Sequence, residues 1–274
     1  MDFPDLSELK DVYAKISPYI HNTPVLTSNL SNKYAGSDVL FKCENFQRTG
    51  AFKMRGAINA ILNIPEKKRK EGVATHSSGN FAQALSLSAH LLSVPATIVM
   101  PSNAPQVKKE AVSSYGAKIV ECEPSLKSRE TTLKDVLNRQ GGTFLHPSND
   151  LQVIMGNATA FYELFHHSGP LAAVITPVGG GGLLAGTALA AHHLNPECAI
   201  FAGEPYGADD AWKSFHLGKI QPSVNPVTIA DGLRTQLGHI NFPIIQKYVQ
   251  DIIRVEENEI IFAMKFLWQR LKII

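Results

Sequence analysis

The chain has 274 residues, which is enough for one large α/β unit or two modest domains. Hydrophobic residues make up 44% of it, and the formal net charge is +2 with no basic or acidic block. This composition is typical of a globular protein, and it argues against a nucleic-acid partner and an anionic membrane surface. No apolar run approaches the roughly 18 residues that a membrane-spanning helix needs.

The N-terminal residues MDFPDLSELKDVYAKI are polar and predict a helix, not a signal peptide. Three scattered cysteines, Cys43, Cys122 and Cys198, argue against a disulfide framework and for a reducing, cytoplasmic compartment. Adjacent histidines at 166–167 and 192–193 point in different directions on a helix. We therefore expect them at the surface or its boundary, and not in a zinc site.

The stretch ENFQRTGAFKMRGA, residues 44–57, places a lysine in apolar surroundings. Lys53 lies between Phe52 and Met54, and lost hydration would favour its neutral form. The charge of Arg55 would act in the same direction. A neutral amine can form a Schiff base with an aldehyde, and pyridoxal 5′-phosphate carries one. The alternative is a lysine that extends from a helix start into solvent.

Strands and helices alternate between residues 71 and 149. Apolar runs predict strands at 73–76, 95–101, 117–122 and 142–147, and the segments between them predict helices. This alternation is typical of a parallel, doubly wound sheet.

The segment THSSGNFAQ, residues 75–83, joins the first of these strands to a helix through Ser77, Ser78, Gly79 and Asn80. Hydroxyl groups, an amide and free N–H groups at a helix N-terminus suit a carboxylate ligand. The alternative is an ordinary Ser/Asn helix cap.

A second alternating series starts near residue 151. It predicts strands at 171–178, 199–204 and 249–255 and helices at 155–167, 183–194 and 258–274. The last helix carries Ile260, Met264, Leu267, Trp268 and Leu271 along one face. We therefore predict an α/β protein with two doubly wound parallel-sheet lobes: a small domain at 71–149, and a large domain made of 1–70 and 150–274.

PVGGGGLLAG, residues 177–186, holds four consecutive glycines between a strand and a helix, namely Gly179, Gly180, Gly181 and Gly182. Glycine backbone can adopt positive φ and approach a ligand closely, and the helix N-terminus favours a phosphate. A tight turn would need only one or two glycines.

Two other phosphate sites compete with this interpretation. A Walker loop is excluded because no Gly-Lys-Ser/Thr follows the spacer. The glycines and Ala185 do fit G-x-G-x-x-A, and Glu204 ends the next strand, so an NAD-binding oxidoreductase is an alternative. That alternative leaves the lysine stretch unexplained.

In this order, ENFQRTGAFKMRGA, THSSGNFAQ and PVGGGGLLAG resemble the fold-type II (tryptophan-synthase-β-like) pyridoxal-phosphate enzymes, in the serine racemase and serine/threonine dehydratase branch. The resemblance covers the whole chain. It implies a homodimeric lyase or isomerase that eliminates water from L-serine or L-threonine to give a 2-oxo acid and ammonia, racemises serine, or does both. It also leaves regulation by nucleotides open.

The resemblance implies a role for each motif. Lys53 resembles the Schiff-base lysine, Phe52 would pack beside the cofactor ring, and Asn80 would contact its 3-oxygen. Gly179 to Gly182 would hold the phosphate. Ser77, Ser78 and Gly79 would line the substrate carboxylate pocket, with Ser78 as the acid/base opposite the lysine.

The segment GEPYGADD, residues 203–210, reads by itself as a polar loop with Glu204, Asp209 and Asp210. By resemblance it matches a Mg²⁺ or Ca²⁺ site whose ligands are Glu204, the Ala208 carbonyl and Asp210. Ligation by oxygen alone suits these hard cations.

The chain departs from the family pattern at two places. Phe81 stands where the family has a histidine, which would change the pocket wall and the substrate range. The family also continues past WQRLKII with a segment that carries the group facing the pyridine nitrogen. We expect the sequence to be a fragment, or a truncated, non-catalytic protein that keeps the fold.

Overall fold

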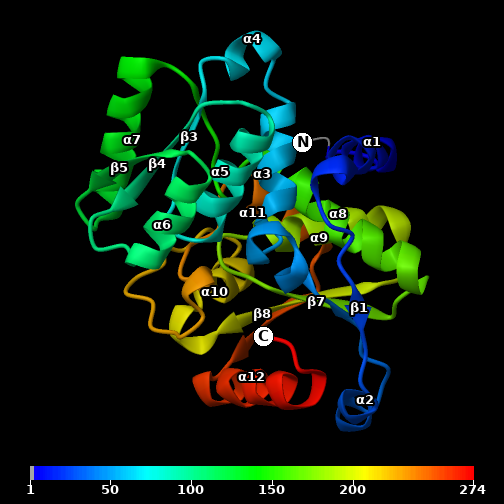
Figure 1. Ribbon diagram of the computed structural model, residues 1–274. Helices are drawn as coiled ribbons and strands as arrows, with labels where there is room; N and C mark the ends of the chain where they lie inside the picture. The colour runs from blue at the N-terminus through cyan, green and yellow to red at the C-terminus, as the bar shows by residue number, and fades with distance from the viewer. Residues whose placement is uncertain (1–2) are drawn as a thin grey trace.

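The computed structural model describes residues 3–274, which form two parallel sheets, each accompanied by helices (Figure 1). Short 3₁₀ turns connect the regular elements at Ser17–Tyr19 (η1), Glu44–Phe46 (η2), Arg48–Gly50 (η3), Tyr206–Ala208 (η4) and Asp231–Leu233 (η5). The predicted α/β class is confirmed.

The smaller part of the molecule is built on a four-stranded parallel sheet. Its strands are β3 (Val73–His76), β4 (Ala96–Pro101), β5 (Lys118–Cys122) and β6 (Thr143–Phe144). Helices α5 (Asn80–Leu91), α6 (Gln106–Ser114) and α7 (Leu126–Gln140) connect them. The strand order is β5-β4-β3-β6, so the sheet grows in one direction from β3 to β5 and then returns to the other side of β3.

This reversal creates a topological switch point between β3 and β6, which pair in parallel with Val73 opposite Thr143. Ligands of open α/β sheets bind outside the carboxyl ends of strands at such a point. The segments that leave these two ends are 77–80 and 146–150. The fold therefore predicts a ligand site at these two loops.

The second sheet has three parallel strands in the order β7-β8-β9. They are β7 (Ala173–Pro177), β8 (Ala199–Pro205) and β9 (Asp251–Val255). Its helices are α8 (Leu151–Ser168), α9 (Gly182–Leu194), α10 (Asp210–Leu217), α11 (Asn241–Tyr248) and α12 (Glu257–Leu271).

The N-terminal segment holds several short elements, most of which the sequence pattern did not reveal. These are α1 (Leu6–Ile16), α2 (Asn29–Ala35), the antiparallel strands β1 (Val25–Leu26) and β2 (Phe41–Lys42), α3 (Lys53–Leu62) and α4 (Glu66–Arg69). Among them, only helix α1 was predicted, from the polar N-terminal stretch, and it begins with a capping box between Asp5 and Glu8.

Helices α3 and α8 cross at close range and bring the N-terminal segment into the core. A Cβ atom added to Gly156 of α8 would lie 2.3 Å from the Arg55 carbonyl oxygen, and one added to Gly56 would lie 2.7 Å from the Val153 carbonyl oxygen. Only glycine allows two helix backbones to approach so closely. The crossing fixes where α3, and with it Lys53, lies.

Two further predictions concern the last helix and membrane-spanning segments. Helix α12 forms, but it buries none of the residues in Glu257–Leu271, and Met264 and Trp268 are 58% and 62% exposed. No helix within residues 3–274 combines the length and hydropathy that a membrane crossing requires. The domain boundaries at 70/71 and 149/150 remain a prediction, which the two separate sheets support.

Candidate active site

Lys53 is the first residue of α3, and its amine reaches a loop from the small sheet. Its Nζ donates a 2.8 Å hydrogen bond to the Pro147 carbonyl oxygen. The same nitrogen lies 4.9 Å from the centroid of the Phe52 ring and 5.9 Å from that of Phe81. Phe81 is the second residue of α5 and is 1% exposed. Two aromatic rings and a carbonyl group therefore surround the amine.

Burial lowers the pKa of Lys53 from 10.5 to about 8. Among the ion pairs of residues 3–274, none includes this lysine, so no carboxylate opposes the shift. A shift of this size raises the neutral fraction at neutral pH by roughly two orders of magnitude. The amine is thereby prepared to act as a nucleophile or a base.

The predicted cause of this shift, burial in apolar surroundings, is confirmed, but the predicted contribution of the Arg55 charge was wrong. Met54 belongs to the core, where it is 0% exposed and its Sδ accepts from the Ser88 hydroxyl. The charge of Arg55 does not lower the lysine's pKa, because its guanidinium is paired with Glu44 and Glu163. The apolar company of Lys53 comes instead from Phe52 and from Phe81, 28 residues further along the chain.

The loop after β6, residues 146–150, is the part of the site that sequence reasoning missed. Its His146 Nδ1 accepts from the backbone N–H groups of Ser148 and Asn149 at 3.2 and 2.8 Å. Burial, helped by His76 and Lys53, lowers the pKa of His146 to about 4, so the ring is neutral. The available signal was LHPSND, a polar run at the carboxyl end of a predicted strand.

The glycine loop lies against the same segment. A Cβ atom added to Gly182 would lie 3.0 Å from the Ser148 Cα, and one on Gly180 would lie 2.5 Å from the Ser148 Oγ. Gly181 has φ +78° and precedes the first residue of α9 as its N-cap. Asn241 links the two segments, since its Nδ2 donates to the carbonyl oxygens of Ser148 and Gly180 at 3.0 and 2.7 Å.

The segment after β3 has open space beside its backbone at Gly79. Gly79 is the N-cap of α5, and a Cβ atom added to it would have nothing within 4 Å. The ordinary Ser/Asn cap considered above does not form, since no side chain of the described residues caps this helix. The Ser77 hydroxyl accepts from the Gly79 N–H at 3.3 Å instead. Ser78 is half-buried, and Asn80, the first residue of α5, is exposed.

These segments together fit a ligand with an aldehyde at one end and a phosphate at the other. The lysine amine is held by a neutral carbonyl, which leaves it free to react. The glycine loop leads into the uncapped N-terminus of α9, where N–H groups and the helix dipole favour an anion. Backbone fills the space that side chains on Gly179 or Gly182 would take.

The acidic segment after β8 has two buried carboxylates without ion-pair partners among the described residues, those of Glu204 and Asp210. Among the described residues, neither carboxylate oxygen of Asp210 has a hydrogen-bond partner, and the residue is 5% exposed. Burial raises the pKa of Asp210, although the Ser223 hydroxyl lies near enough to oppose that shift. Asp209 instead pairs with Lys213 and Arg254 at 2.6 and 3.2 Å.

Glu204 is 1% exposed, and burial raises its pKa to about 8. Its two carboxylate oxygens accept from the N–H groups of Ala211 and Trp212 at 2.8 and 2.7 Å. The nicotinamide alternative needs this acid to face a ribose, so its burial argues against that alternative. Within residues 3–274, no three His, Cys, Asp or Glu side chains converge as a metal site, so a cation here would need the Ala208 carbonyl as well.

Comparison with known proteins identifies relatives over nearly the whole chain. A family model described as pyridoxal-phosphate dependent enzyme matches residues 16–274. The chain is 47% identical to a serine racemase from Dictyostelium discoideum, over 98% of this chain and 84% of that protein. It is 43% identical to a beta-hydroxyaspartate dehydratase from Paracoccus denitrificans (strain Pd 1222), over 100% of this chain and 87% of that protein.

Solved structures agree in fold. The crystal structure of a threonine deaminase from T.th. matches with a TM-score of 0.92 and 39% sequence identity, over 98% of this chain and 88% of that one. The fold predicted from the three motifs is therefore confirmed.

Proposed function

This chain belongs to the pyridoxal-phosphate-dependent enzymes, and we propose that it acts on 3-hydroxy amino acids, by β-elimination to a 2-oxo acid and ammonia and by racemisation. One observation carries the proposal. A lysine with a pKa lowered to about 8 lies where the loops of two sheets meet, next to a glycine loop at a helix N-terminus. The relatives, named as serine racemases, dehydratases and deaminases, support the substrate class.

The residues divide the work by position. The Nζ of Lys53 would hold the cofactor, and the same amine would take the proton from the substrate Cα. Gly179 to Gly182 bind the phosphate through backbone N–H groups. The cofactor, when bound, accepts the electron pair that the lost proton leaves.

The segment after β3 receives the substrate. Ser77, Ser78, Gly79 and the N-terminus of α5 bind its carboxylate, which orients the Cα–H bond toward Lys53. Ser78 returns a proton to the opposite face of Cα when the outcome is racemisation. When the β-hydroxyl leaves instead, hydrolysis gives the 2-oxo acid and ammonia. Phe52 and Phe81 exclude water from the lysine.

The decisive experiment is Lys53→Ala with pyridoxal 5′-phosphate added to the purified chain. We expect wild type to develop visible absorbance and, after borohydride reduction, to carry the pyridoxyl group on the peptide containing Lys53. The variant should show neither. A yellow variant, or a label on another lysine, would refute the assignment. Binding of a nicotinamide nucleotide without any uptake of the aldehyde would favour the oxidoreductase alternative.

We also infer a structural Mg²⁺ or Ca²⁺ ion bound by Glu204, the Ala208 carbonyl and Asp210. The two unpartnered oxygens of Asp210 support this inference, since a buried carboxylate needs a charge partner. Added Ca²⁺ should raise the melting temperature of wild type and leave that of Asp210→Asn unchanged. An equal rise in both proteins would contradict it.

A homodimer and a cytoplasmic location complete the proposal. All three cysteines are free and buried, which is in line with a reducing compartment. Sedimentation velocity tests the dimer: a single species at monomer mass across a broad concentration range would exclude it.

A further inference from the structure

A bidentate ion pair joins the two ends of the segment that carries Lys53. Glu44 and Arg55 lie 11 residues apart, one before and one after the turn that leads to the lysine. Arg55 Nε and Nη2 donate to the two carboxylate oxygens of Glu44, each at 2.8 Å. Such a fork fixes the relative orientation of both groups as well as their distance.

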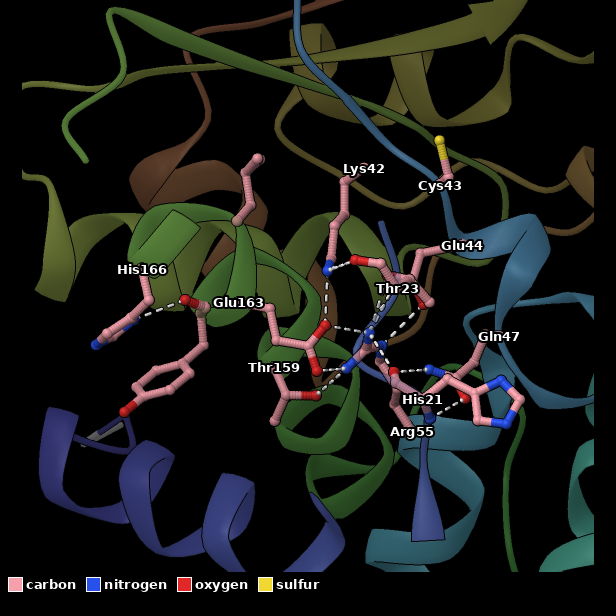
Figure 2. Close-up of polar contacts among 12 residues, drawn as sticks. His21, Thr23, Lys42, Cys43, Glu44, Gln47, Arg55, Thr159, Glu163 and His166 are labelled. Carbon is pink, nitrogen blue, oxygen red and sulfur yellow. Dashed lines mark hydrogen bonds and ion pairs between the residues drawn. The ribbon is translucent and has the colours of Figure 1, made fainter. Parts of the chain in front are cut away.

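A second fork ties the same guanidinium to helix α8 (Figure 2). Arg55 Nη1 and Nη2 donate to the carboxylate of Glu163 at 2.9 and 2.7 Å, and Nη1 also reaches the Thr159 hydroxyl at 3.2 Å. Lys42 completes the network, with its Nζ 2.6 Å from Glu163. The positive charges of Lys42 and Arg55 thus balance the two carboxylates. The Arg55 guanidinium at the centre of this network is 0% exposed.

The network holds a turn that is otherwise unfavourable. Thr49 has φ +61°, a left-handed conformation that non-glycine residues seldom adopt, and its buried hydroxyl has no partner among the described residues. Backbone in such a conformation persists only where surrounding contacts determine it. The two forks of Arg55, two residues after Lys53, supply such contacts at the end of the turn.

We propose that Arg55, held by Glu44 and Glu163, is the positioning residue for Lys53. It sets the place and rotation of the first turn of α3 and thereby aims the lysine amine at the Pro147 carbonyl, between the rings of Phe52 and Phe81. The proposal rests on the proposed function only in treating Lys53 as the reacting amine. The role of Arg55 is geometric, because its charge is balanced within the network.

The test measures the amine itself, on the full chain prepared without cofactor. Competitive labelling with limiting acetic anhydride, followed by peptide mapping, gives the titration midpoint of Lys53. Burial is the cause of the lowered pKa of Lys53, and the neighbouring His146, whose own pKa is lowered to about 4, stays neutral throughout this titration. We expect a wild-type midpoint near 8, and in Glu44→Gln a midpoint moved toward the 10.5 of a hydrated lysine.

Arg55→Lys separates geometry from charge, since it keeps the cation and loses both forks. It should shift the midpoint upward as Glu44→Gln does. Lys42→Met is the matched control: it removes one ion pair from the network and leaves both forks of Arg55. We expect lower thermal stability from it and an unchanged midpoint.

If Glu44→Gln and Arg55→Lys do not fold, Thr23→Val provides a milder change. It removes the 2.6 Å hydrogen bond from Thr23 to Glu44 and leaves every charge in place. A folded variant of Glu44, Arg55 or Thr23 with the wild-type midpoint would overturn the proposal, as would a shift in Lys42→Met. Because no cofactor is present, this result is independent of whether pyridoxal phosphate later proves to be the ligand.

Discussion

At the scale of single residues, the environment of Lys53 gives a defined pH dependence. Its pKa is about 8 in the folded chain and 10.5 when hydrated, so between these values the unfolded chain binds more protons. The free energy of unfolding should therefore rise with pH across this window, because the cost of burying the charged form disappears. In Lys53→Met this contribution to the slope should be lost, which urea unfolding of both proteins at several pH values would measure. An identical slope in both proteins would contradict the lowered pKa.

Ser78 offers a test of the two-sided arrangement. Ser78→Ala should suppress conversion between serine enantiomers by roughly two orders of magnitude or more, the usual contribution of a positioned acid or base. Elimination from L-serine should largely survive, because Lys53 alone removes that proton. Chiral chromatography of serine and a 2-oxo acid assay on the same sample measure both. Equal loss of the two activities would refute the assignment.

The proposed reacting residues could be named from the sequence because each stands in a short motif, but their surroundings could not be predicted. The amine of Lys53 bonds to Pro147, 94 residues away, and its second ring comes from another helix. Neighbours of this kind depend on tertiary packing, which no local pattern records. The misassigned role of Arg55 has the same origin, since its partner Glu163 lies 108 residues away.

At the scale of elements, the glycine loop packs tightly against η5, which predicts a position in the loop that does not tolerate a side chain. Gly179→Ala would place a Cβ atom 2.8 Å from the Leu233 Cα and 3.1 Å from the Gly232 carbonyl oxygen. Overpacking against backbone costs about 1–3 kcal/mol, so affinity for pyridoxal 5′-phosphate should fall by roughly tenfold or more. Equilibrium titration of the absorbance measures it.

The control for this substitution lies in the same contact. Gly232→Ala points into open space, with nothing within 4 Å of the added atom. It should leave the affinity close to that of wild type. If both variants bind equally well, the loop does not hold the phosphate.

The predicted elements succeeded where apolar runs and helical repeats were long enough to read. All strands from β3 to β9 and helices α5 to α9 lie where these patterns placed them. The strands of the N-terminal segment were not predicted, because β1 and β2 contain two residues each, which is too few to show an alternating pattern. Helix α12 was recognised, but its apolar face packs against too little protein to be buried.

At the scale of the whole molecule, one ion pair joins the outer edges of the two parts. Lys108 of α6 lies 2.6 Å from Asp231 of η5, and both side chains reach solvent. Exposed pairs contribute only about 0–1 kcal/mol to stability and weaken with salt. Asp231→Asn should therefore hardly change the melting temperature. We expect the pair to restrain the two parts, so its loss should raise KM for the amino acid. It should also remove the dependence of KM on ionic strength that we expect in wild type.

Lys109→Met provides the comparison. Lys109 is the next residue of the same helix, but its partner Glu121 lies within the small sheet, at 2.6 Å. This variant should keep the wild-type salt dependence of KM. A salt-independent KM in wild type would show that the Lys108 pair does not restrain the two parts. The sequence could not reveal this contact, because 123 residues separate its two members.

The amide of Asn241 has a mechanical consequence. By bonding to both Ser148 and Gly180, it ties the loop after strand β6 to the glycine loop that leads into helix α9. Displacement of one of these loops must therefore pull on the other. The lysine is hydrogen-bonded to Pro147, the residue before Ser148, so its amine is held in place by the same pair of joined loops.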